Sequence, residues 1–108
     1  ARGASELPRD FALYQNRPNP SRQSTIIVYQ LPKPVDTSLK IYDLKGGLVR
    51  TLVDEKQKPG YYSLVWDGKG RDGEKVASGV YFYRLTAHPE GSRESGGFIQ
   101  TKKLALLR

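Results

Sequence analysis

Apolar residues recur at about every second position over most of this chain, which is the period of a β-strand rather than of a helix. Glycine, proline and Asp-Gly pairs interrupt the alternation often, as expected where tight turns join short strands. The pattern predicts strands at residues 11–16, 24–31, 37–44, 48–54, 61–66, 79–87 and 98–107. It predicts turns or loops at 17–21, 32–34, 46–47, 56–60 and 88–97.

Seven short strands at regular spacing are typical of an all-β antiparallel sandwich, in which each strand turns one face toward a shared core. We assign residues 9–108 to this sandwich and residues 1–8 to a linker from an upstream domain. The side chains predicted to form the core are Ile27, Leu39, Ile41, Leu64, Trp66, Tyr81 and Tyr83.

Charge and composition narrow the classes of function. Lys and Arg outnumber Asp and Glu by 18 to 11, so the chain carries a net charge of +7 and favours acidic partners. The basic residues are scattered from Arg2 to Arg108 rather than gathered in a stripe, so we do not expect a nucleic-acid partner. No apolar stretch approaches the length of a membrane span, and the first residues do not resemble a secretion signal.

The residue types on which many active sites depend are scarce. The chain has no Cys, which excludes disulfides, thiol nucleophiles and Cys-bound zinc. The single histidine, His88, is expected in an exposed loop, and one histidine supplies catalytic triads poorly. The sequence therefore predicts a protein that is not an enzyme and has no cofactor.

The stretch after Trp66 contains Asp67, Asp72 and Glu74, and a cluster of carboxylates has two interpretations. Asp67-Gly68 and Asp72-Gly73 are typical of tight turns, because Asp bonds its own backbone and Gly adopts positive φ. The same three carboxylates could bind calcium, although the spacing of an EF-hand is absent. We favour the turn interpretation and expect no catalytic acid pair, because such a pair flanks a cleft.

Four segments, taken in order, carry a family resemblance that covers nearly the whole chain. They read FALYQNRPNP, IYDLKGGLV, WDGKGRDGEKVASGVYFYRL and KKLALLR. Together they resemble the C-terminal sorting domains of the Por, or type IX, secretion system, which overlap with the immunoglobulin-like domain of the flagellar hook-capping protein. The residues that match the motifs are Pro18, Asn19, Pro20, Tyr42, Asp43, Gly46, Trp66, Asp67, Gly68, Gly73, Ser78, Gly79, Tyr81, Lys102 and Lys103, followed by the apolar stretch 104–107.

The resemblance implies an immunoglobulin-like sandwich that directs the export and the cell-surface attachment of a larger secreted bacterial protein. It implies outer-membrane secretion machinery and an upstream cargo domain as partners, and cargo that is joined to anionic lipopolysaccharide. The domain would then be exported, to the cell surface or the extracellular space. The last strand, with residues 102–108, is expected to be an edge that the machinery recognises.

Two other functions remain open at this point. One is a carbohydrate-binding or cell-wall-binding accessory module of a secreted glycoside hydrolase, because an exposed ring such as Tyr61 could stack on a sugar. The other is a structural spacer or assembly scaffold, as in the hook-capping relatives, because one fold supports several functions.

Overall fold

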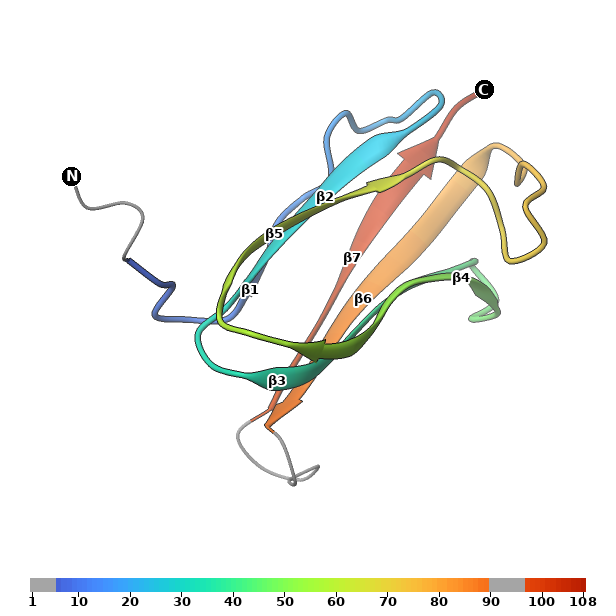
Figure 1. The fold of residues 1–108 in the computed structure, drawn as a ribbon. Helices are drawn as coiled ribbons and strands as arrows, with labels where there is room; N and C mark the ends of the chain where they lie inside the picture. The colour runs from blue at the N-terminus through green and yellow to red at the C-terminus, as the bar shows by residue number, and fades with distance from the viewer. Residues whose placement is uncertain (1–5, 90–96) are drawn as a thin grey trace.

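The computed structural model describes residues 6–89 and 97–108, which form two antiparallel β-sheets that lie face to face (Figure 1). These residues contain seven strands and no helix, so no described helix could span a membrane. The strands are β1 (Ala12–Leu13), β2 (Thr25–Leu31), β3 (Val35–Tyr42), β4 (Leu48–Gln57), β5 (Gly60–Trp66), β6 (Gly79–Pro89) and β7 (Phe98–Leu106).

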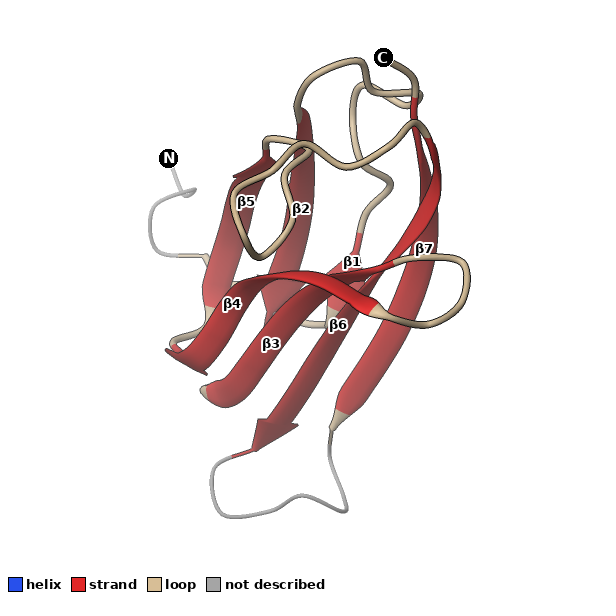
Figure 2. Ribbon diagram, turned by 90° about the vertical axis from the view of Figure 1, so that its right-hand side faces the viewer, coloured by secondary structure: helices blue, strands red, loops and turns tan. Residues whose placement is uncertain are grey.

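One sheet has three strands in the order β1-β2-β5, and the other has four strands in the order β4-β3-β6-β7. All pairs of neighbouring strands are antiparallel, with Ile27 opposite Leu64 in the first sheet and Leu39 opposite Leu85 in the second. Figure 2 shows the four-stranded sheet in front, with β4, β3, β6 and β7 side by side, and the three-stranded sheet behind it. This arrangement confirms the all-β immunoglobulin-like sandwich of about seven strands.

The core lies between the sheets because alternate residues of the strands point inward and remove their apolar surface from water. Six of the seven predicted core side chains are buried, and the exception is Leu64, which is half-buried. Leu64 belongs to β5, an edge strand, where the opposing sheet covers side chains incompletely. The core also contains Leu13, Tyr29, Leu31, Val35, Val53, Leu85, Ala87, Leu104 and Leu106.

The predicted strand 11–16 shortens to two residues because its second half turns inward. Asn16 is 1% exposed, and its side-chain amide donates hydrogen bonds to the Pro18 carbonyl and the Thr25 hydroxyl. This turn takes the segment out of the sheet at the point where the predicted turn 17–21 begins. The Arg17–Pro18 and Asn19–Pro20 peptide bonds within that turn are both cis.

Some strand boundaries differ from those predicted. β4 continues to Gln57, past the predicted start of the turn, because Gln57 pairs with Val35 and its side chain accepts a hydrogen bond from the buried Tyr29 hydroxyl. His88 was expected in a loop but lies within β6, opposite Asp36. Most of the predicted polar loop 88–97 and most of the predicted linker 1–8 lie outside the described residues.

Candidate functional site

Asp43 organises the hairpin turn between β3 and β4. One of its carboxylate oxygens accepts hydrogen bonds from the backbone nitrogens of Lys45 at 2.9 Å and Gly47 at 2.8 Å. Gly46 has a φ of +87°, a backbone conformation that favours glycine. The motif residues Asp43 and Gly46 therefore determine the shape of this turn, while Tyr42 lies half-buried on the outer face of the sheet.

The long loop 67–78 is anchored at Trp66, the last residue of β5. The indole nitrogen of Trp66 donates a hydrogen bond to the Lys69 carbonyl at 2.9 Å, and its ring meets Tyr81 edge-on at 5.7 Å between centroids. Burial is the main cause that raises the pKa of Tyr81, whose hydroxyl donates to the Ala77 carbonyl. These two aromatic motif residues close this end of the core.

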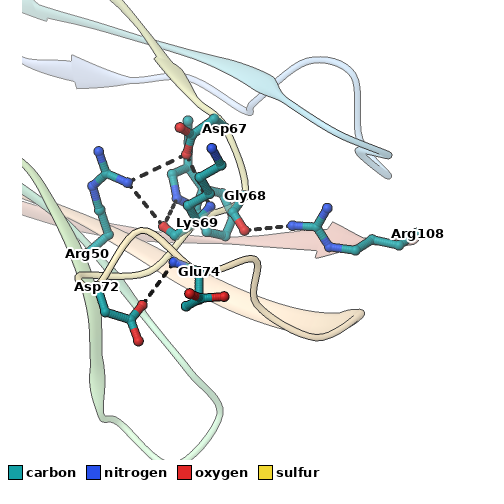
Figure 3. A network of polar contacts seen from close by, with 8 residues as sticks. Arg50, Asp67, Gly68, Lys69, Asp72, Glu74 and Arg108 are labelled. Atoms are coloured by element: carbon teal, nitrogen blue, oxygen red, sulfur yellow. Dashed lines mark hydrogen bonds and ion pairs between the residues drawn. The ribbon is translucent and has the colours of Figure 1, made fainter.

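The carboxylates of this loop form turns. Asp67 accepts a hydrogen bond from the Lys69 amide at 3.1 Å, and Asp72 accepts one from the Glu74 amide at 3.0 Å (Figure 3). Gly68 and Gly73 have φ angles of +77° and +83°, as Asp-Gly turns require. Within residues 6–89 and 97–108, no three His, Cys, Asp or Glu side chains are grouped so that they could hold a metal ion.

The Pro18–Pro20 motif lies along the outer edge of β7 near the end of that strand. The side-chain oxygen of Asn19 accepts a hydrogen bond from the Ala105 amide at 3.0 Å. The Ser21 backbone donates to the Ala105 carbonyl at 2.8 Å and accepts from the Leu107 amide at 2.7 Å. β7 is an edge strand of the four-stranded sheet, as expected, but backbone groups of Ala105 and Leu107 at its end are already paired.

Arg108 links the tail of the chain to the long loop. Its guanidinium donates to the carbonyl oxygens of Gly68 at 2.6 Å and Val76 at 2.9 Å, and its amide donates to the Ser78 hydroxyl at 2.9 Å. Figure 3 shows Arg108 reaching the loop on one side, while Arg50 reaches it on the other. Arg50 bonds the Lys69 carbonyl and forms an ion pair with Asp67 at 3.6 Å.

The predicted site residues of three segments gather at one end of the sandwich. Pro18, Asn19 and Pro20, the Trp66–Gly79 segment and the end of β7 meet at one end of the sandwich, where hydrogen bonds join them. Lys102 and Lys103 do not act as a pair, because successive residues of a strand point to opposite faces. Lys102 is half-buried toward the inside, and Lys103 is exposed on the outer face.

Prediction from the sequence missed Arg50 and Arg108, although both tie the loop 67–78 to other parts of the domain. Their contacts join residues 17–40 positions apart, and no local sequence pattern predicts such contacts.

Prediction from the sequence also missed an exposed apolar patch on the outer face of the β1-β2-β5 sheet. The patch consists of Tyr14, Ile26, Val28, Tyr61 and Val65, of which all but Val28 are exposed.

Two antiparallel sheets around one small core, closed at one end by a loop tied to the tail, define an immunoglobulin-like β-sandwich module. The chain belongs to the FlgD Ig-like domain family, whose model matches residues 17–91. This is a family of immunoglobulin-like domains.

In the curated relatives and in the similar structures, the matched domain is one part of a larger protein. The basal-body rod modification proteins FlgD of Salmonella typhimurium and Salmonella typhi are each 35% identical over 65 residues, which cover 59% of this chain and 28% of each relative. Dimeric latent PorU from Porphyromonas gingivalis has a TM-score of 0.68 at 24% identity, over 91% of this chain and 9% of PorU. FlgD from P. aeruginosa has a TM-score of 0.61 at 22% identity, over 92% of this chain and 69% of that protein. The two structural likenesses concern the fold.

Proposed function

We propose that this domain is a non-catalytic module that directs the export of a larger bacterial protein and its attachment to the cell surface. Its partners are the outer-membrane secretion machinery, which binds the folded domain, and the cargo upstream in the same chain. The cargo is then joined to anionic lipopolysaccharide. The domain itself needs no cofactor, and it works outside the cell or on its surface.

The observation that carries this proposal is the convergence of the motif segments. Residues as distant in sequence as Asn19 and Ala105, or Gly68 and Arg108, are hydrogen-bonded neighbours at one end of the sandwich. A surface assembled from such distant segments exists only when the domain is folded. A partner that recognises this end therefore recognises a folded domain rather than a linear peptide.

The surface features support binding rather than catalysis. Half-exposed Tyr14 and Ile26, together with the more exposed Tyr61 and Val65, form the apolar patch on the three-stranded sheet. Exposed apolar side chains gathered on one face favour contact with another protein or domain. Asp67 and Asp72 of the long loop are engaged in turn hydrogen bonds, and Asp67 also in an ion pair, which is not an arrangement that favours acid-base catalysis.

A second candidate is supported by the family itself. The matched family takes its name from FlgD, and FlgD from Xanthomonas campestris, a protein of similar fold, is linked to hook capping in flagellar assembly. A scaffold that positions neighbouring subunits uses the same sandwich without any export step. The two candidates differ in whether the domain alone can carry a foreign protein to the surface.

Export can be tested with single side chains, because deletion of residues 102–108 would remove the buried Leu104 and Leu106 along with the motif. The test fuses residues 1–108 to a reporter in a bacterium with a type IX secretion system and compares Arg108→Ala with Arg71→Ala. Arg71 is an exposed arginine of the same loop and makes no described contact.

Surface display of the reporter should fall severalfold for Arg108→Ala and stay near wild type for Arg71→Ala. Melting curves of both purified domains verify that they remain folded at the assay temperature. Equal display by the two folded variants would refute recognition of this end.

A further inference from the structure

The outer face of the four-stranded sheet brings two cations directly opposite each other. Lys40 of β3 pairs with Arg84 of β6 in the antiparallel register, and both side chains point away from the core. Residues opposite each other on one face have Cβ atoms about 5 Å apart, and like charges in this arrangement are destabilising. The fold therefore carries an electrostatic cost at this position.

No described carboxylate forms an ion pair with Lys40 or Arg84. The nearby Lys103 forms no ion pair within residues 6–89 and 97–108 either. Lys40 lines a shallow hollow of this face together with Asp36, Asp54, Glu55 and His88, so it lies at the border between these carboxylates and the cations Arg84 and Lys103. The face is thus acidic toward one end and basic toward the other.

Arg84 is held in one orientation at the basic end. Its guanidinium lies over the Tyr42 ring, 5.2 Å from the centroid, and its Nε donates to the Thr101 hydroxyl at 3.1 Å. The Nη nitrogens make no described hydrogen bond, which leaves donors for a second partner. A guanidinium fixed in this way binds an oxyanion at a lower entropic cost than a freely rotating one does.

Two further side chains extend this arrangement. Phe82 lies opposite both Tyr42 and Lys103, and its half-buried ring is on the outer face of the sheet. Lys103 is exposed beside it. The basic end of the face therefore consists of an aromatic ring with an ammonium group on one side and the Lys40–Arg84 pair in the next row of the sheet.

We propose that this basic-aromatic face, formed by Lys40, Tyr42, Phe82, Arg84 and Lys103, binds an acidic polysaccharide. A carboxylate or phosphate of the polymer is bound between Lys40 and Arg84, where it relieves their repulsion. A sugar ring packs against Phe82, and Lys103 binds the next acidic group. The proposal goes beyond the export function and stands without it, because it concerns binding by the isolated domain.

The geometry favours a saccharide over a single-stranded nucleic acid. Nucleic acid binds open sheets by stacking successive bases on several rings, while a continuous phosphate backbone follows a basic groove. Here the Tyr42 ring is already covered by Arg84, so Phe82 is the ring that remains for stacking on this face.

The test measures binding of the 108-residue domain to polygalacturonate by isothermal titration calorimetry. The methyl-esterified polymer is the neutral control, because it keeps the sugar backbone and loses the charges. The double variant Arg84→Gln/Lys103→Gln is compared with Arg71→Gln/Lys33→Gln, which removes two charges elsewhere that make no described contact. The two doubles have the same net charge, so general attraction to a polyanion falls equally in both.

We expect the first double variant to weaken binding about tenfold or more, as loss of charge-assisted hydrogen bonds does, and the second to change it by less than about threefold. Phe82→Leu should weaken binding without removing charge. Equal loss in the two doubles, equal binding of the esterified polymer, or tighter binding of oligothymidylate than of polygalacturonate would overturn the proposal.

Lys40→Gln gives a second readout that does not require a ligand. Removal of one of the two opposed charges should raise the melting temperature of the free domain and weaken its binding to polygalacturonate. A site selected only for stability would not combine these two changes. A lower melting temperature for this variant would contradict the repulsion between Lys40 and Arg84 on which the proposal rests.

Discussion

The hydroxyl of Tyr83 donates a hydrogen bond to the Tyr14 carbonyl oxygen at 2.7 Å, across 69 positions of sequence. The same hydroxyl accepts a hydrogen bond from the Asn16 backbone amide at 2.8 Å, and the Tyr83 side chain is fully buried. One side chain of β6 therefore fixes the N-terminal segment that leads into the Pro18–Pro20 motif.

Tyr83→Phe should lower the free energy of unfolding by about 1–3 kcal/mol, because it leaves the Asn16 amide without its partner in a buried position. Tyr62→Phe is the matched control, since the Tyr62 hydroxyl makes its bond to the Lys58 carbonyl in an exposed position. The control should cost less than about 1 kcal/mol. Urea denaturation of both variants measures the difference, and equal costs would show that the buried link contributes little.

Two buried tyrosines make the fold sensitive to alkaline pH. Burial raises the pKa of Tyr29 and of Tyr83 to about 12 from the ordinary value of 10, against smaller lowering effects of hydrogen bonds with Gln57 and Asn16. The folded pKa lies above the unfolded one, so the stabilisation is complete below pH 10 and is lost as pH rises toward 12. The loss should be on the order of 1 kcal/mol per pH unit for each tyrosine.

Urea denaturation at a series of pH values, with tyrosinate absorbance as the probe of ionisation, measures this loss. Tyr83→Phe should show a shallower decline of stability between pH 10 and pH 12 than the wild type does. Identical slopes would mean that Tyr83 ionises equally well in the folded state.

A glycine in the long loop can be required by its positive φ or by a lack of space for a Cβ, and Gly68 and Gly73 allow the two effects to be measured separately. Both have positive φ, but a Cβ at Gly68 would lie 2.5 Å from the Arg108 guanidinium and 3.0 Å from the Gln23 carbonyl, whereas a Cβ at Gly73 would have open space. Gly73→Ala should cost about 1–2 kcal/mol for the backbone alone. Gly68→Ala should add about 1–3 kcal/mol for the crowding and should release Arg108 from the loop. Thermal unfolding of both variants tests the order, and a larger cost at Gly73 would contradict it.

Chelation should not affect stability. Asp67 and Asp72 accept backbone hydrogen bonds in their turns, and Asp67 also forms an ion pair with Arg50, so these carboxylates already have donors. Melting curves with calcium and with a chelator should superimpose. A higher melting temperature in calcium would restore the metal interpretation of this loop.

The strands could be predicted from the sequence because a strand with one buried face alternates apolar and polar residues along a short stretch of chain. Ile27, Tyr83 and Trp66 were identified as core residues in this way, and all three are buried.

The polar contacts that join the motif segments could not be predicted, because they depend on which distant segments meet. Asn16, Ser21 and Thr25 are polar yet buried. Polar residues near prolines are expected in exposed turns, so the sequence alone does not predict their burial. Their partners come within reach only when the N-terminal segment, β6 and β7 meet. For the same reason the sequence identified the long loop as a unit but not the arginines that hold it.

The central claim is that the folded domain alone directs a protein to the cell surface, and surface display measures it most directly. A reporter that carries residues 1–108 is expressed in two isogenic bacteria, one with a working type IX secretion system and one without it. The proposal predicts protease-accessible reporter on the surface of the first strain and retention inside the second. Retention in both strains, with a stable and folded fusion, would contradict export and leave the scaffold as the function to test.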